Sequence, residues 1–151
     1  MKPHHRLFFV ALLPPMPLQE RVTQIKQHFA EVYHSSHALK SPPHITLQPP
    51  FEWLASEITA LQHCLEEFAS EHTAIPVALS GFGSFSDRVI YIDVVRTPEL
   101  LELQKQLSFA FATTLNMVDK VGRSQPSLST SYDRRIQGLD SQEFQAGLAR
   151  I

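Results

Sequence analysis

The sequence predicts an α+β fold, and three observations favour that class. Apolar stretches of strand length alternate with amphipathic stretches of helix length along the 151 residues. Proline and glycine separate these stretches, and no low-complexity linker divides the chain. The order of a strand, a helix and a short proline-led strand occurs twice. We therefore expect a single domain over residues 1–151, built as two similar lobes.

The first half of the chain is expected to hold two strands and two helices. Residues 7–13 are nearly all apolar and end at Pro14-Pro15, which predicts a buried central strand. Two later stretches have apolar residues at helical spacing, which predicts amphipathic helices. The first consists of Leu18, Val22, Ile25, Phe29 and Val32, with polar residues including Lys26 between them. The second consists of Leu54, Ile58, Leu61, Leu65 and Phe68.

The second half is expected to open with two strands and a helix. Residues 75–79 and 89–95 have strand composition, and the glycine-rich stretch between them predicts a turn over 81–87. In the second strand Ile90, Ile92 and Val94 alternate with Val89, Tyr91, Asp93 and Val95, so one face should be the more deeply buried. Thr97-Pro98-Glu99 is typical of a helix start. The last expected elements are a strand over 127–132 and a helix from about 141 to 148.

Composition limits the function. A formal net charge of −2 argues against a broad basic surface for nucleic acid, although a local pocket for one RNA end remains open. Cys64 is the only cysteine, which excludes an internal disulfide and a multi-cysteine zinc site, and we expect a buried, inert thiol. Residues 7–13 are too few to span a membrane, and no signal-peptide cleavage pattern follows them. We therefore expect a cytoplasmic protein that does not bind membranes.

The segment around His44 is the strongest functional signal. Pro42-Pro43 favours extended backbone before it, and Pro49-Pro50 is expected to end the strand after it. On such a strand His44 and Thr46 share one face, while Ile45 and Leu47 point into the core. An imidazole beside a hydroxyl can hold and protonate a phosphate. The alternative is an unrelated α+β domain in which His44 is structural.

With these residues the chain resembles the 2H phosphoesterase superfamily, the 2′,5′ RNA ligase and cyclic phosphodiesterase group. The resemblance rests on Arg6-Leu7-Phe8-Phe9-Val10-Ala11-Leu12, on Pro43-His44-Ile45-Thr46-Leu47, and on Phe51 just after it. The order of elements also fits through about Tyr132. Members carry two His-x-Thr/Ser motifs on strands of two pseudo-symmetric lobes. The resemblance thus implies antiparallel or mixed sheets with helices packed outside.

The second motif of the family is altered in this chain. Pro126, Leu128, Ser129 and Tyr132 match its pattern, but Ser127 stands where the second catalytic histidine is expected. Family members resemble acid–base catalysts in which two imidazoles open a 2′,3′-cyclic phosphate, each worth about 10²–10⁴-fold in rate. A serine hydroxyl cannot replace an imidazole in proton transfer, although it still donates a hydrogen bond to phosphate.

The resemblance implies a protein that needs no metal or other cofactor and acts on an RNA end or a cyclic nucleotide. His44 is then the catalytic residue, and Thr46, Ser127 and Ser129 hold phosphate. Phe51 and Tyr132 are the expected substrate-binding aromatics, with core packing as the alternative for Tyr132. The missing histidine leaves a second reading open, a catalytically silent module that binds nucleotides or RNA ends. Nothing in the sequence indicates the oligomeric state.

Three further features have two readings each. The family continues past its second motif, so we expect either a shorter chain that lacks a C-terminal edge strand or a block that has diverged after about Val121. His34 and His37 would ligate a metal if their segment were helical, but a solvated loop is the preferred interpretation. Asp133-Arg134-Arg135 either steers an anionic ligand or forms an ordinary surface cluster.

Overall fold

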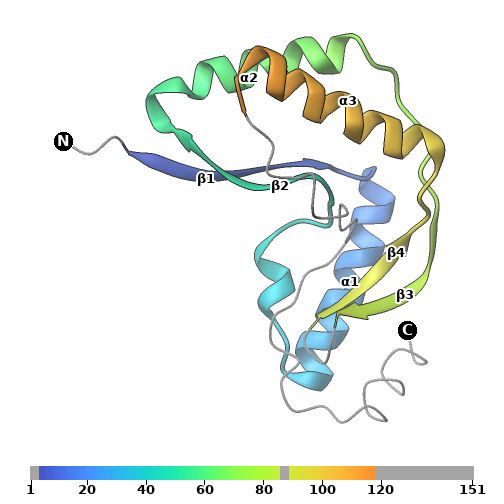
Figure 1. Ribbon diagram of the computed structural model, residues 1–151. Coiled ribbons are helices and arrows are strands. Elements are labelled where there is room, and N and C mark those ends of the chain that lie inside the picture. Colours follow the sequence, from blue (N-terminus) through green and yellow to red (C-terminus); the bar gives the residue numbers. More distant parts are fainter. Residues whose placement is uncertain (1–3, 86–88, 118–151) are drawn as a thin grey trace. The chain divides into compact units, whose positions relative to one another are not determined.

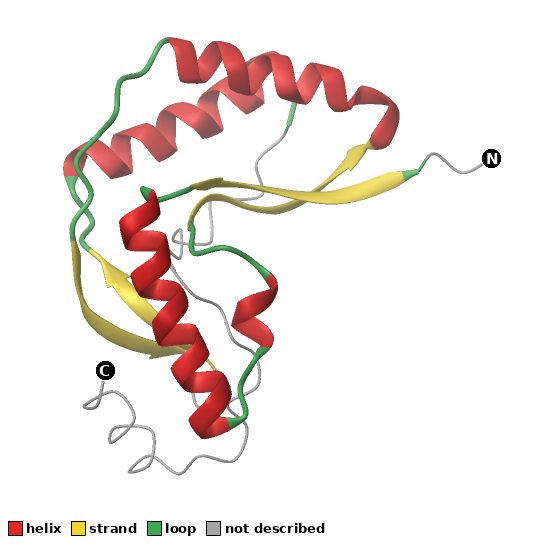
Figure 2. Cartoon of the chain, turned by 180° about the vertical axis from the view of Figure 1, so that it is seen from behind, coloured by secondary structure: helices red, strands yellow, loops and turns green. Residues whose placement is uncertain are grey.

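The computed structural model describes residues 4–85 and 89–117, which form two compact units (Figures 1 and 2). Within the described residues, the first unit holds 4–11, 46–78 and 96–117, and the second holds 12–45, 79–85 and 89–95. The predicted α+β class is confirmed. The elements are β1 (His5–Leu12), α1 (Met16–Tyr33), η1 (His37–Lys40), β2 (Ile45–Leu54), η2 (Ala55–Glu57), α2 (Ile58–Ser70), β3 (Leu79–Phe85), β4 (Val89–Val94) and α3 (Pro98–Thr114).

The first unit is a strand pair covered by two helices. Strand β1 is bonded to β2. The backbone N–H of Ala55 donates to the carbonyl of His4 at 2.9 Å, so the start of β1 lies beside the end of β2 and the pair is antiparallel. Helices α2 and α3 both lie on one side of this ribbon (Figures 1 and 2). The core of this unit contains Leu47, Leu61, Cys64, Leu100, Leu103, Leu107 and Phe111, all buried.

The expectation of a buried central strand at the N-terminus is wrong. Leu7 is 69% exposed and Phe9 is 49% exposed, whereas Phe8 and Val10 are only partly exposed. Among the described residues β1 has one partner strand, and α2 and α3 lie on one face of the pair. A strand covered on one face shows this alternation even when nearly all its residues are apolar.

Strand β2 is longer than predicted. Pro49-Pro50 does not end it, because the strand continues to Leu54, a residue expected to begin the following helix. Helix α2 starts only at Ile58, after the short turn η2. Each proline removes one N–H donor, and because successive N–H groups point to opposite sides, only one of the two missing donors faces β1.

The predicted start of α3 is confirmed. The helix runs from Pro98, and the hydroxyl of Thr97 accepts a 3.3 Å hydrogen bond from the backbone N–H of Leu100. Glu99 lies in the first turn, where a carboxylate interacts favourably with the positive end of the helix. The apolar stripe of α3 faces the core through Leu100, Leu103, Leu107 and Phe111.

The second unit combines α1 and η1 with an antiparallel hairpin of β3 and β4. Helix α1 matches its predicted range, and it lies alongside the hairpin in both views (Figures 1 and 2). Ile90, Ile92 and Val94 are buried whereas Asp93 and Val95 are exposed, which confirms the predicted alternation.

Strand β3 corrects the prediction for the segment before β4. Residues 75–78 are not in a strand, and the glycine-rich stretch expected to turn is itself paired through Phe85. The register shifts between Leu79 and Phe82, and Gly81 in that interval has φ of 73°. Glycine adopts this left-handed conformation without strain, so the bulge accommodates it inside the strand.

The strand predicted over 127–132 and the helix predicted from about 141 to 148 lie outside the described residues. Among the helices that the structure describes, none is both long enough and apolar enough to cross a membrane.

Candidate functional site

His44 immediately precedes β2, at the end of an irregular segment that begins at Ser41. Ile45 is 5% exposed and Leu47 is 4% exposed, whereas His44 and Thr46 are only partly buried. This is the alternation expected for extended backbone that sends the apolar side chains into the core. Among residues 44–47, His44 and Thr46 therefore retain access to solvent.

A backbone carbonyl fixes the tautomer of the His44 ring. Nδ1 of His44 lies 2.8 Å from the carbonyl oxygen of Pro42. A carbonyl only accepts hydrogen bonds, so Nδ1 carries the proton and donates it. In the neutral ring the lone pair is then on Nε2, which becomes the nitrogen that can take up a proton.

Lys26, expected among the polar residues of its helix, is buried beside the segment that leads to His44. Its side chain is 4% exposed, and Nζ donates to the carbonyl oxygens of Ala38 at 3.1 Å and Ser41 at 3.0 Å. Burial lowers the pKa of the Lys26 ammonium. The signal was present in the spacing, because Lys26 lies four residues after Val22 and three before Phe29, on the apolar side of α1.

Phe51 lies in an aromatic cluster inside the first unit. Its ring centroid is 6.3 Å from that of Phe8 on β1 and 5.9 Å from that of Phe111 on α3. The Phe51 and Phe111 rings meet edge to face, a favourable arrangement for aromatic pairs. Phe51 therefore links the strand pair to α3, and its predicted contact with substrate stays a prediction.

The remaining predicted binding residues cannot be placed. Ser127, Ser129 and Tyr132, together with the cluster Asp133-Arg134-Arg135, lie outside the described residues. Their predicted roles toward phosphate and base stay predictions.

His34 is exposed in an irregular loop, as expected, whereas His37 opens the short helical turn η1. His34 ends α1 with φ of 55°, and His37 opens η1 with an Nδ1 atom that is buried and has no hydrogen-bond partner. Ser35 and Ala38 are buried. Within residues 4–85 and 89–117, no group of three or more His, Cys, Asp or Glu side chains could hold a metal ion.

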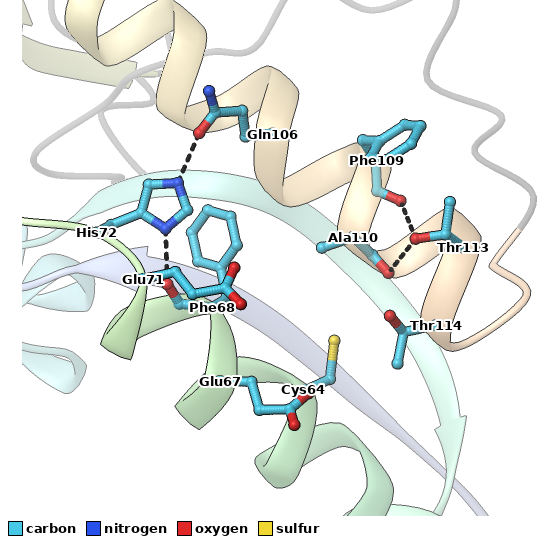
Figure 3. Close-up of a pocket in the computed structure, with 10 residues that line it drawn as sticks. All are labelled: Cys64, Glu67, Phe68, Glu71, His72, Gln106, Phe109, Ala110, Thr113 and Thr114. Carbon is cyan, nitrogen blue, oxygen red and sulfur yellow. Dashed lines mark hydrogen bonds between the residues drawn. The ribbon is translucent and has the colours of Figure 1, made fainter.

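A cavity of about 340 Å³ lies between α2 and α3 of the first unit (Figure 3). His44, Thr46 and Phe51, the predicted site residues that the structure describes, do not line it. The lining residues are Cys64, Glu67, Phe68, Glu71, His72, Gln106, Phe109, Ala110, Thr113 and Thr114. Cys64 is buried as predicted, and burial raises the pKa of its thiol, which keeps it protonated and unreactive.

His72 joins the two helices at one end of this cavity. Its Nδ1 lies 2.6 Å from the carbonyl oxygen of Phe68, and its Nε2 lies 2.5 Å from Oε1 of Gln106 (Figure 3). Nε2 of Gln106 donates to Glu102 at 3.0 Å, which turns Oε1 toward His72. Both ring nitrogens thus face acceptors, and only the imidazolium form donates from both. These contacts raise the pKa of His72, the carbonyl of Phe68 contributing most.

Comparison with known proteins agrees with the sequence motifs. A family model of the 2'-5' RNA ligase superfamily matches residues 14–141, which is most of the chain. Three relatives are each described as "Putative phosphoesterase", from Bacillus anthracis (strain A0248), Bacillus thuringiensis (strain Al Hakam) and Bacillus cereus (strain Q1). Each is 27% identical to this chain over 106 residues, which cover 69% of this chain and 59% of the relative. The match thus spans little more than half of each relative's length.

Proposed function

This chain belongs to the 2'-5' RNA ligase superfamily, and from that premise we propose that it acts on phosphodiester bonds at RNA ends or in cyclic nucleotides. The expected substrates carry a 2′,3′-cyclic phosphate, and the reaction needs no metal ion. The observation that carries the proposal is the hydrogen bond from Nδ1 of His44 to the carbonyl of Pro42, which leaves Nε2 as the proton acceptor. A histidine with a defined tautomer, next to a partly exposed Thr46, suits acid–base work on a phosphate.

In this mechanism His44 moves one proton at Nε2. It serves one of the two transfers: either it takes a proton from the attacking water as neutral imidazole, or it gives one to the departing ribose oxygen as imidazolium. The hydroxyl of Thr46 donates a hydrogen bond to a non-bridging phosphate oxygen. Ser127 and Ser129 are proposed to donate in the same way. Because Ser127 stands in place of a second imidazole, the other proton transfer has no assigned side chain. We therefore expect slow turnover.

Ser127 is also the observation that favours a second candidate function. A site with one imidazole and several hydroxyls keeps the donors that hold phosphate and loses one partner of the acid–base pair. Such a protein binds cyclic nucleotides or RNA ends without converting them. The two candidates differ only in turnover, so one experiment separates them.

That experiment follows a 2′,3′-cyclic nucleotide by phosphorus NMR in the presence of EDTA, with the full chain. We expect slow opening of the cyclic phosphate, its loss in His44→Ala, and an increase of about 10²–10⁴-fold in Ser127→His. His63→Ala is the matched control, because the side chain of His63 is 71% exposed on α2 and takes no part in the proposal. Binding without turnover in every variant would favour the silent module. Neither binding nor turnover would contradict both candidates.

A further inference from the structure

Lys26 connects α1 to the segment that leads to His44, within the second unit. The ammonium group contacts two carbonyl oxygens, those of Ala38 and Ser41, at 3.1 Å and 3.0 Å. These carbonyls lie in and directly after η1 (His37–Lys40). The side chain is 4% exposed, and its contact with Ala38 is buried whereas its contact with Ser41 is partly buried.

A buried ammonium group costs free energy unless it is well partnered, and a carbonyl left without a donor is costly as well. The Lys26 ammonium group and the carbonyls of Ala38 and Ser41 satisfy one another, because Nζ donates a hydrogen bond to each carbonyl. The backbone of Ser41 is thus held against the middle of α1 at a defined point.

Little conformational freedom separates that point from His44. Only Pro42 and Pro43 lie between Ser41 and His44, and a proline ring fixes φ near −65°. The carbonyl of Pro42, one peptide beyond Ser41, is the group that accepts the hydrogen bond from Nδ1 of His44. Because Pro42-Pro43 is stiff, fixing the backbone at Ser41 also fixes the position of the Pro42 carbonyl. This carbonyl is the acceptor that sets the tautomer of the His44 ring.

We propose that Lys26 is a positioning residue, which holds the Pro42 carbonyl where it keeps Nδ1 of His44 protonated and so fixes the tautomer of the ring. This inference rests on the proposed function, since it assigns His44 its working tautomer. The inference adds Lys26, a residue of α1, to the proposed site. Lys26 would act through His44 and would not need to contact the substrate. A lysine that served stability alone would leave the tautomer of a correctly folded protein unchanged.

The test compares Lys26→Met with Lys40→Met in the full chain. Met keeps the apolar stem of lysine and removes the ammonium, and Lys40→Met removes the same charge at an exposed position of η1. The tautomer of His44 is followed by ¹⁵N–¹H NMR, which distinguishes the two ring nitrogens. We expect one Nδ1–H tautomer in the unsubstituted protein and in Lys40→Met, and a mixture of both tautomers in Lys26→Met.

Kinetics with a 2′,3′-cyclic nucleotide provide the second readout. We expect Lys26→Met to lower kcat by about 10²-fold, the scale of an error of about 1 Å in placing a catalytic group, with a smaller change in KM. The NMR readout needs no turnover. If no variant turns over the substrate but Lys26→Met still mixes the tautomers, the proposed function fails and the role of Lys26 stands.

A folded Lys26→Met protein with an unchanged His44 spectrum would overturn the inference. Should Lys26→Met fail to fold, Lys26→Arg decides, because guanidinium keeps the charge but is a planar fork that does not reproduce a compact ammonium between two carbonyls. A folded Lys26→Arg protein with mixed His44 tautomers supports the inference. The same protein with the unsubstituted spectrum and unchanged kcat would show that Lys26 serves stability alone.

Discussion

The side-chain amide of Gln104 on α3 donates a 2.9 Å hydrogen bond to the backbone carbonyl of Leu47 on β2. Both residues are buried, at 8% and 4% exposure, and Leu47 directly follows Thr46. The bond ties α3 to the strand that carries the proposed phosphate-binding hydroxyl. A polar side chain in the core of the first unit is therefore explained by the carbonyl it satisfies.

Gln104→Met should lower the free energy of unfolding by about 1–3 kcal/mol, because it leaves the buried Leu47 carbonyl without a donor. Urea unfolding measures the loss. Gln27→Met, at an exposed position of α1, is the matched control and should change stability by less than about 0.5 kcal/mol. Equal effects of the two substitutions would show that the buried bond contributes nothing.

His72 should make stability depend on pH. Its pKa is raised in the folded protein above the ordinary value of 6.5, so the imidazolium is stabilised by folding. That contribution is fully present below the ordinary value and disappears as the pH rises through the raised one. We expect the stability difference between the unsubstituted protein and His72→Leu to shrink as the pH rises from below the ordinary value of 6.5 through the raised pKa. Urea titrations at a series of pH values measure it.

Gln106→Leu provides the check on that assignment. It removes the acceptor of Nε2 and keeps the carbonyl of Phe68 as the acceptor of Nδ1. The pH-dependent part of the stability should become smaller without vanishing. The contact with the Phe68 carbonyl, which remains, is the larger cause of the pKa shift of His72. An unchanged pH profile in Gln106→Leu would contradict the proposed link between α2 and α3.

Gly83→Ala should destabilise the β3–β4 hairpin. Gly83 is paired with Tyr91, whose ring lies over it, and a Cβ at this position would be 2.7 Å from Cε2 of that ring. The ring must move, which costs about 1–3 kcal/mol. Thermal or urea unfolding of Gly83→Ala measures it. In a Tyr91→Ala background, Gly83→Ala should lower the free energy of unfolding clearly less. An undiminished loss in that background would show that the Tyr91 ring does not cause the destabilisation.

Thr97→Ala should remove the cap of α3. The hydroxyl of Thr97 accepts from the N–H of Leu100, and losing such a cap costs about 1 kcal/mol. Thr97→Ser keeps the hydroxyl and should retain most of the stability. Circular dichroism during urea unfolding distinguishes the two variants, and identical losses in both would exclude the capping role.

The parts of the fold that the sequence predicted well have strong local signals. The apolar spacing of α1 and the Thr97-Pro98 start of α3 depend on neighbours within a few residues, and both agree with the structure. The alternation in β4 is equally local, and it is confirmed by the burial of Ile90, Ile92 and Val94.

The predictions are wrong where contacts with residues distant in sequence determine the burial or the conformation of a residue. Lysine is usually exposed, so Lys26 was assigned to the polar residues of its helix, whereas two carbonyls from a later segment draw it inward. Gly83 looked like a turn residue because the ring of Tyr91, which requires a glycine there, belongs to the other strand. Leu7 and Phe9 read as core because apolar composition does not reveal how many faces of a strand are covered.

The paired prolines inside β2 have a consequence beyond this molecule. Successive N–H groups of a strand point to opposite sides, so Pro49 and Pro50 remove one donor toward β1 and one on the far side. An incoming strand from a second molecule that tried to extend the ribbon there would meet a gap in the hydrogen-bond ladder. Such gaps discourage edge-to-edge aggregation, and the sequence places this one within a few residues of His44.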